Sequence, residues 1–245
     1  MDSKTFLFCK FGEEKWLREL QKGKLYCKNL KYYSQLEKQS NDTAMGDYRE
    51  GKHIETQCQV KLYEYGTTNL VLDLKGANIA IGTEESVKMP VFCLVGLRDT
   101  DIERIDNEDK EMYLFKPKET LSEILKEKYW NSALIIRNPL EFVKRIVNRC
   151  NEEGIEYKFG FVNYTDMSIN YLDREESIES NFQNVAFWKD NQYKKQYEYR
   201  MAFINKMVED NFILDVGDLS DITTLLDEEK LKKAINAEYI AEFRK

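Results

Sequence analysis

The sequence predicts a single α+β domain over residues 1–245, with a mixed, mostly antiparallel sheet and helices packed on it. Three observations lead to this fold class. Residues 54–97 are rich in short strand-like segments separated by turns, as in a meander. Amphipathic segments with helix caps lie before and after this region. The chain has no internal repeat, linker or break in composition, which favours one domain.

The first elements are a strand, a helix and a second strand. Thr5–Phe11 is an apolar run of strand length, and Lys24–Lys28 is the next strand-like segment. Between them we expect a helix with Glu13 and Glu14 in its first turn, where acidic side chains favour the helix dipole. Gly23 supplies the stop signal.

A polar loop and a meander follow a short helical turn. The loop holds Asp47, Arg49 and Glu50 between two glycines, and we expect it to be solvated, as surface loops usually are. Four strands are predicted in the meander: Gln57–Tyr65, Leu70–Leu74, Asn78–Ile81 and Val91–Leu97. The last of these is the most apolar and is expected to be central in the sheet.

The second half contains both helices and strands. We first expect an exposed acidic loop at Asp99–Glu111, a helix with a capping box at Thr120 and Glu123, and a strand at Asn131–Arg137. A helix follows with Asn138 as its N-cap and Pro139 at its first position, and then a strand at Tyr157–Tyr164 and an acidic loop through residues 173–179. The chain ends with a strand at Phe212–Val216, a connector at Asp218–Leu226 and a last helix capped by Asp227.

Composition limits the classes of function. Hydrophobic residues make up 42% of the chain, which is enough for a core, and the formal net charge is −7. This charge argues against a broad basic surface for duplex DNA but leaves room for a local basic patch. Phosphate-binding glycine loops and the motifs of zinc proteases and serine hydrolases are absent from the sequence.

The cysteines and the histidine indicate neither a disulfide framework nor a metal site. The 5 cysteines are scattered and none forms a C-x-x-C pair, so we expect them, like the single histidine His53, to be structural. The first residues, MDSKTFLFCK, contain no long apolar segment of the kind found in a secretory leader, and no apolar run approaches membrane-spanning length. We therefore expect a cytoplasmic protein without a membrane partner.

Residues 186–204 carry the strongest candidate site. Tyr197, Tyr199, Met201 and Phe203 alternate with Gln196, Glu198 and Arg200, as in a strand with one apolar and one polar face. Upstream, an expected loop contains Phe187, Trp188, Lys189 and Tyr193. The polar face has two interpretations: it faces solvent without a further role, or it holds functional groups in fixed positions.

With this pattern, the chain resembles the ADP-ribosyltransferase superfamily, in which a late strand carries a [Q/E]-x-E motif after a substrate-recognition loop. The resemblance implies that NAD is bound, that Glu198 is the catalytic glutamate and that Gln196 orients the acceptor. Further binding positions are implied in the same way: Trp188 or Tyr193 for the loop aromatic, Lys10 on the first strand, Tyr26 or Ser34 for a hydroxyl, and Arg200 or Lys10 for a pyrophosphate.

A second resemblance concerns small uncharacterised bacterial and phage proteins, some of which are encoded among defence and counter-defence genes. It rests on the order of elements and on six polar residues: Asp47, Glu50, Lys189, Gln196, Glu198 and Arg200. This resemblance implies a role in conflict between phage and bacterium.

Two alternatives remain open. In the first, the chain is a binding protein, an inhibitor or sensor that uses Trp188, Tyr193 and Tyr197 as an aromatic anchor for a protein or nucleic-acid target. In the second, it is a magnesium-dependent nuclease. Its carboxylate ligands would be Asp47, Glu50 and Glu198, and Lys189 or Lys195 would lie near the scissile phosphate.

Overall fold

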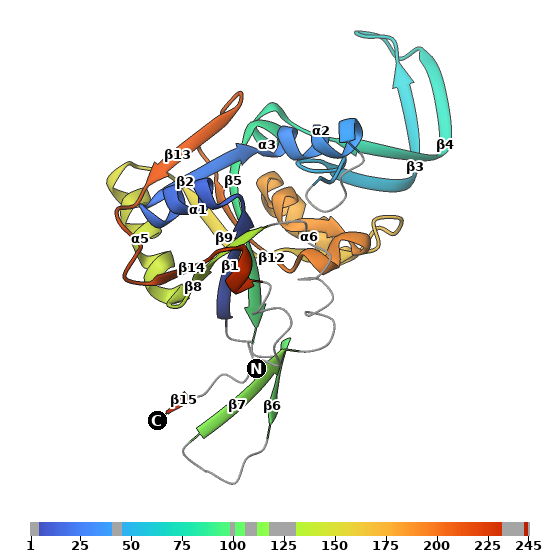
Figure 1. Ribbon diagram of the computed structural model, residues 1–245. Coiled ribbons are helices and arrows are strands. Elements are labelled where there is room, and N and C mark those ends of the chain that lie inside the picture. Colours follow the sequence, from blue (N-terminus) through green and yellow to red (C-terminus); the bar gives the residue numbers. More distant parts are fainter. Residues whose placement is uncertain are drawn as a thin grey trace.

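The computed structural model of this chain describes residues 5–40, 46–98, 101–105, 112–117, 131–231 and 243–244. Helices and a large antiparallel sheet make up the body, so the predicted α+β class is confirmed (Figure 1). The main sheet has 8 strands, and every ladder within it is antiparallel. Its members are β1 (Thr5–Gly12), β2 (Lys24–Asn29), β5 (Pro90–Arg98), β8 (Ser132–Ile136), β9 (Tyr157–Phe161), β12 (Glu198–Phe203), β13 (Asn211–Asp215) and β14 (Thr223–Leu226).

Strand β5 is the hub of this sheet, as its apolar sequence predicts. It pairs with β2 at Pro90 and Val91, with β1 in its second half, and with β12 from Val91 to Val95. Because directly opposed residues in an antiparallel ladder share a face, Cys9, Val95 and Glu198 lie on one face of the sheet. The side chains of Leu94 and Tyr199 lie on the other face.

Two helices cover the Leu94 face. Helices α1 (Glu14–Gln21) and α5 (Pro139–Glu152) bury Leu17, Leu20, Phe142 and Ile146 against Phe8, Phe92, Met201 and Phe203. The predicted cap of α5 is present, since Asn138 Oδ1 accepts a hydrogen bond from the Glu141 amide at 3.1 Å.

The opposite face is covered by helix α2 (Leu30–Ser40) and the 3-10 helix η2 (Phe182–Phe187). Leu30, Ala186 and Phe187 pack there against Val91 of β5 and Ala202 of β12. The polar face of β12 is therefore inside the protein, beneath these elements.

Strands β3 (His53–Tyr63) and β4 (Leu70–Ile81) form a separate two-stranded hairpin that projects from the body (Figure 1). The two predicted strands at 70–74 and 78–81 are one strand. Gly76, with φ +69°, lies at an irregularity in the ladder, which explains why the sequence there resembles a turn. Large apolar side chains are exposed along this hairpin: Leu62, Tyr63, Tyr65, Leu70, Val71, Leu72, Leu74 and Ile81.

Several connecting segments differ from their predictions. Helix α6 (Leu172–Ser180) replaces the predicted acidic loop, because Arg174 and Ile178, four positions apart, bury one face while the acidic residues line the other. Helix α3 (Glu84–Lys88), capped by Thr83, was not predicted. The predicted connector before Asp227 contains β14, and the strand predicted over Tyr157–Tyr164 is divided into β9 and β10 (Asn163–Thr165).

Short strands and 3-10 helices complete the described chain. Strand β11 (Trp188–Asp190) pairs in parallel with β10, and the 3-10 helix η3 (Asn191–Gln196) follows it. The predicted acidic loop at 99–111 contains β6 (Ile102–Ile105), which pairs with β7 (Met112–Pro117), and β7 pairs with β15 (Phe243–Arg244). The helix predicted at Thr120 and Glu123 lies outside the described residues. Asp227 begins a helical segment at residues 228–231, as predicted, and its Oδ1 accepts a hydrogen bond from the Lys230 amide.

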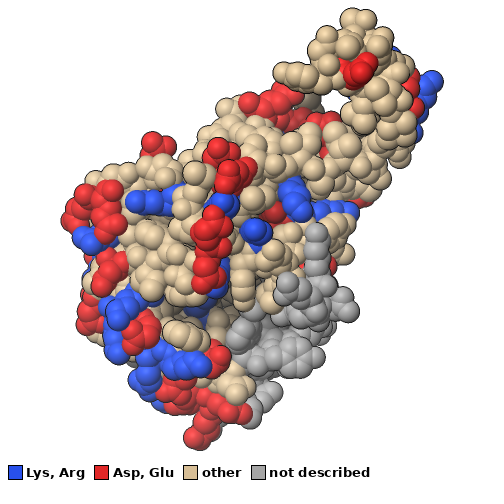
Figure 2. Space-filling model, turned by 90° about the horizontal axis from the view of Figure 1, so that it is seen from above, with Lys and Arg blue, Asp and Glu red and all other residues tan. Residues whose placement is uncertain are grey.

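Acidic and basic side chains are interspersed over the face of the body seen in Figure 2. Among the described residues, no helix is long and apolar enough to span a membrane.

Candidate functional site

The candidate site forms where β12, β11 and the loop at residues 46–51 meet beneath the sheet. Glu198 and Arg200 lie two residues apart on β12, so both side chains point to the face that α2 and η2 cover. The loop places Glu50 against them, and β11 adds Lys189. All four side chains are buried, with 6%, 1%, 3% and 2% of Glu198, Arg200, Glu50 and Lys189 exposed.

The loop at 46–51 is held in place by turns and by contacts to distant elements. The Glu50 amide donates to the Asp47 carbonyl at 2.9 Å, which closes a turn. Gly51 has φ +72°, a conformation that favours glycine, and its carbonyl accepts a hydrogen bond from Ser86 Oγ at 2.7 Å. Arg49 forms a 2.7 Å ion pair with Asp190 at the end of β11. The loop is thus tied directly to the strand that carries Lys189.

Glu50, Lys189, Glu198 and Arg200 form a closed network, here called the buried charge cluster. Arg200 donates two hydrogen bonds to Glu50, at 2.7 and 2.8 Å, and its Nε donates to Glu198 Oε1 at 2.5 Å. Lys189 Nζ lies 2.8 Å from Glu50 Oε1 and 2.9 Å from Glu198 Oε2. Two carboxylates and two cations therefore cancel, which is the condition for keeping charges inside a protein.

The network keeps all four groups ionised. Burial opposes ionisation of Glu198, but the charges of Arg200 and Lys189 outweigh it and hold the pKa of the carboxyl below its usual value. The pKa of Glu50 is lowered by the same balance. Burial likewise opposes the charged form of Lys189, and the two carboxylates raise its pKa above that of a free lysine.

Asp47 lies beside the buried charge cluster but outside its charge balance. Burial, together with the neighbouring Glu50 charge, raises the pKa of Asp47 from 3.8 to about 7. Its Oδ1 accepts a hydrogen bond from the Arg49 amide at 2.9 Å. The Asp47 carboxyl thus titrates near neutral pH, unlike Glu50 and Glu198.

Glu198 also opens onto a cavity of about 340 Å³. The cavity lies beyond the second half of β5, next to β9 and β10. Its lining residues are Gly96, Arg98, Asp101, Phe161, Val162, Asn163, Tyr164, Lys194, Tyr197 and Glu198. The lining therefore includes two basic residues, three aromatic residues and two acidic residues, Asp101 and Glu198.

Two details shape this cavity. The Arg98 guanidinium stacks over the Phe161 ring, 4.0 Å from its centroid. Gly96 leaves room for the neighbouring rings, because a Cβ at this position would lie 2.7 Å from Phe161 Cε1 and 2.9 Å from Tyr199 Cβ. A glycine at this point in β5 is required by the close approach of its neighbours.

The structure brings together six of the predicted site residues: Asp47, Glu50, Lys189, Gln196, Glu198 and Arg200. Gln196 joins the others through its side chain, since its Oε1 accepts a hydrogen bond from Lys189 Nζ at 2.8 Å. These six are the residues of the second resemblance, and they come from chain segments about 140 positions apart.

Three expectations about these residues were wrong. Asp47 and Glu50 are buried although their loop was expected to be solvated, and the loop forms ion pairs with β11 through Arg49 with Asp190 and Glu50 with Lys189. Gln196 ends η3 and is not on the strand. Tyr197 has φ +46° and breaks the alternation, so the regular strand begins at Glu198.

The remaining predicted binding residues lie elsewhere. Lys10 opposes Leu134 on the α5 face of the sheet and donates to the Cys93 carbonyl at 2.6 Å. Tyr26 is 44% exposed and stacks on Trp16. Ser34 Oγ donates to the Tyr48 carbonyl. None of these three lines the cavity.

The expected loop aromatics are not a free surface. Tyr193 is 2% exposed, and its hydroxyl donates to Glu37 Oε2 at 2.8 Å. Trp188 is half-buried and donates from Nε1 to Ser177 Oγ on α6. The aromatic anchor expected for a binding protein is therefore not formed by these residues, although half-buried Tyr197 lines the cavity.

Eight of the ten lining residues were missed by the sequence analysis, among them Arg98, Phe161, Tyr164 and Lys194. The isolated Gly96 inside an apolar strand was the available signal, since such a glycine often marks a close approach to the backbone. It indicates a crowded place but not which side chains meet there.

Comparison with known proteins adds no relative. Neither a protein-family model, nor a curated protein, nor a solved structure matches this chain. The resemblance to ADP-ribosyltransferases and the role in conflict between phage and bacterium stay predictions.

Proposed function

We propose that this chain cleaves the bond between nicotinamide and ribose in NAD, with Glu198 as the catalytic carboxylate. ADP-ribose is then transferred to an acceptor or released to water. One observation supports this proposal most: Glu198 is kept ionised by two fixed cations and lines a cavity that also offers basic and aromatic side chains. Such preorganised charge is the main source of catalysis in many enzymes.

The chemistry requires a fixed negative charge near the ribose. As the nicotinamide C–N bond breaks, its electron pair stays on the ring nitrogen and positive charge builds on ribose C1′. The Glu198 carboxylate stabilises that charge, and this electrostatic stabilisation is strongest where water is excluded. An oxygen of water or of the acceptor then bonds to C1′ and loses its proton to solvent. Nicotinamide and ADP-ribose, free or attached, are the products.

The cavity suits one half of the dinucleotide. At about 340 Å³, it is near the lower end of the roughly 300–1,000 Å³ usual for small-molecule sites. Arg98 and Lys194 supply positive charge for the pyrophosphate, and arginine binds phosphate oxygens in a bidentate manner. The rings of Tyr164 and Tyr197 supply aromatic surface for the nicotinamide.

Lys189 and Arg200 are positioning residues in this proposal. Each binds one oxygen of Glu198, so the carboxylate has a single orientation before substrate arrives. Glu50 balances one of the two positive charges, so Glu198 is not surrounded by an excess of positive charge.

The test combines a cavity variant with a matched surface variant. Arg98→Gln removes a cavity cation, whereas Arg18→Gln removes a cation from an exposed helical pair with Glu14. With labelled NAD and cell extract, we expect release of nicotinamide by the wild type and by Arg18→Gln. We expect a raised KM for NAD in Arg98→Gln, because a phosphate contact is lost.

Glu198→Gln tests the catalytic role, but it also removes one charge from the buried charge cluster. Circular dichroism and denaturant unfolding must therefore accompany its assay. A folded Glu198→Gln protein without turnover supports the proposal. Turnover at the wild-type rate in this variant, or no cleavage of NAD by the wild type with any extract tested, contradicts it.

The nuclease alternative has weaker support from the geometry. Lys189 and Arg200 already bind the oxygens of Glu50 and Glu198 that a magnesium ion would need. We therefore propose no magnesium ion at the buried charge cluster.

A further inference from the structure

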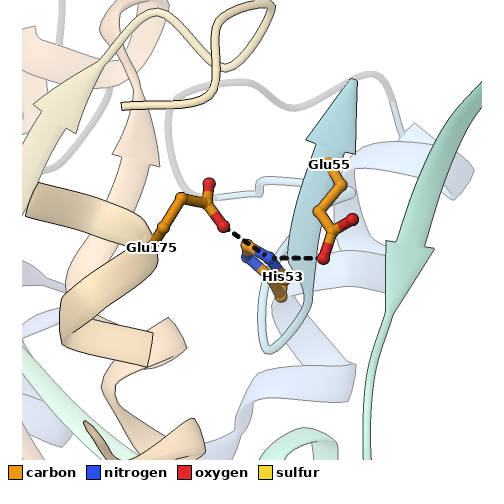
Figure 3. A group of neighbouring side chains, drawn as sticks. All are labelled: His53, Glu55 and Glu175. Atoms are coloured by element: carbon orange, nitrogen blue, oxygen red, sulfur yellow. Dashed lines mark hydrogen bonds and ion pairs between the residues drawn. The ribbon is translucent and has the colours of Figure 1, made fainter. Parts of the chain in front are cut away.

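A second group of polar side chains lies at the base of the β3–β4 hairpin, apart from the residues of the buried charge cluster. His53 and Glu55 come from β3, and Glu175 comes from α6 (Figure 3). His53 Nε2 lies 3.2 Å from Glu55 Oε1 and 3.0 Å from Glu175 Oε2. One ring nitrogen thus faces two carboxylates that approach it from different elements.

The second oxygen of each carboxylate, which does not face His53, accepts a hydrogen bond from another side chain. Glu175 Oε1 accepts a hydrogen bond from Arg174 Nη2 at 3.1 Å, and Glu55 Oε2 accepts one from Cys58 Sγ at 3.4 Å. Each glutamate therefore uses one oxygen for an outer partner and turns the other toward His53. Outer partners of this kind orient the ligands in metal sites.

The His53 ring is buried and incompletely satisfied. Its side chain is 7% exposed, and Nδ1 has no hydrogen-bond partner. A single N–H on Nε2 can satisfy one carboxylate well, but not two. Two carboxylates face this ring nitrogen and Arg174 pairs with only one of them, Glu175, so negative charge is left that a small cation would neutralise.

Two of the three separations between ligand atoms suit a metal ion, and the third, between the two carboxylates, is within 4.8 Å. A transition metal binds histidine nitrogen and carboxylate oxygen at roughly 2.0–2.2 Å, which puts neighbouring ligand atoms about 3.0–3.5 Å apart. The two distances at His53 Nε2, 3.0 and 3.2 Å, fall in this range.

We propose that His53, Glu55 and Glu175 bind one divalent first-row transition cation, such as Mn²⁺ or Zn²⁺. Imidazole nitrogen favours these ions over Mg²⁺ and Ca²⁺, and the two carboxylates supply negatively charged ligands. Three protein ligands leave at least one position for water. This site was not expected from the sequence, which assigns His53 a structural role.

The ion links the projecting hairpin to the body. Two ligands lie in the first residues of β3 and one lies in α6, so the ion adds a fixed connection between them. Contacts already present there include a hydrogen bond from Arg174 Nη2 to the Ile54 carbonyl and hydrogen bonds of Thr56 with Asn170 and Ser168. The ion therefore sets the orientation of the hairpin and is independent of NAD cleavage.

The experiment measures manganese binding to the full chain without a histidine tag. Protein treated with EDTA is titrated with Mn²⁺, and electron paramagnetic resonance follows the signal of the free ion. Mn²⁺ is chosen first because thiolates bind it weakly, so the cysteines do not compete. We expect one ion per chain. Glu175→Gln should weaken binding by more than the roughly 10- to 100-fold that the loss of an outer partner causes.

Glu176→Gln is the matched control, because Glu176 is the next residue of α6 and is exposed. It should bind manganese like the wild type. Hydrogen exchange on the wild type needs no variant: with Mn²⁺, residues 53–56 and 172–178 should become more protected. Three results would each overturn the proposal: no binding of Mn²⁺ or Zn²⁺, equal binding by Glu175→Gln and Glu176→Gln, or bound ion without added protection in these segments.

Discussion

Glu50 and Arg200, 150 positions apart in the sequence, form a buried bidentate ion pair with hydrogen bonds of 2.7 and 2.8 Å. Each is also bound to a second charge of opposite sign, Glu50 to Lys189 and Arg200 to Glu198. The pair fastens the loop at 46–51 to β12. Because burial makes an unpaired charge costly, removal of either partner should lower the free energy of unfolding of the domain.

Glu50→Gln should lower the free energy of unfolding by about 3–5 kcal/mol, the usual cost of leaving a buried charge uncompensated. Urea unfolding measures the change. Glu14→Gln, which breaks the exposed pair with Arg18, is the control, and its expected effect is below about 1 kcal/mol. A double variant, Glu50→Met with Arg200→Met, leaves Lys189 and Glu198 as a balanced pair. The double variant should lose less free energy of unfolding than Glu50→Met and Arg200→Met lose together as single variants. Strictly additive losses would contradict the network.

Asp47 should make stability depend on pH. Its pKa is raised in the folded state, from 3.8 to about 7, so between these values the folded protein binds more protons than the unfolded chain. The contribution of this carboxyl is therefore favourable at low pH and is lost as the pH rises through 7.

Asp47→Asn mimics the protonated carboxyl and removes this dependence. Its stability relative to the wild type should rise between pH 4 and pH 7, by up to about 1.4 kcal/mol per pH unit, and then level off. Urea unfolding across this range measures the difference. Asp166→Asn is the control with the opposite sign, since hydrogen bonds from Ser168 lower the pKa of the half-buried Asp166. A difference for Asp47→Asn that does not change with pH would contradict the prediction.

Gly96→Ala should destabilise the protein and disturb the cavity. The new methyl group would lie 2.7 Å from Phe161 Cε1, and overpacking of this kind costs about 1–3 kcal/mol. Thermal unfolding measures the cost. Gly160→Ala on the neighbouring β9 is the control, because its Cβ would meet only Phe187 at 4.0 Å. Equal effects of the two substitutions would mean that the space at Gly96 is not restricted.

The outer part of the β3–β4 hairpin should exchange its amide hydrogens faster than β5. Within the part of the chain that the structure describes, its strands pair only with each other, and Leu70, Leu72 and Leu74 are 50%, 40% and 44% exposed. A two-stranded ribbon without a packed face is marginally stable by itself. Hydrogen exchange followed by mass spectrometry compares residues 60–74 with residues 90–98. Equal protection would show that the hairpin is covered in solution.

The local patterns were readable in the sequence. The alternation from Glu198 to Phe203, the central position of β5 and the cap at Asn138 were all predicted, because each follows from the periodicity of a strand or from the first turn of a helix. The acidic helix α6 was missed, since its buried face has only Arg174 and Ile178 and shows little apolar periodicity.

The sequence by itself determined the α+β class, most of the main sheet and the polar face of β12 with Glu198 and Arg200. Only the tertiary structure decided what covers that face, which residues line the cavity beside it, and that His53 meets Glu175. Alternation along a strand divides its side chains between two faces but does not say whether a face meets water or another element. Contacts such as Lys189 with Glu50, or His53 with Glu175, depend on how distant segments pack together, and no local pattern records that.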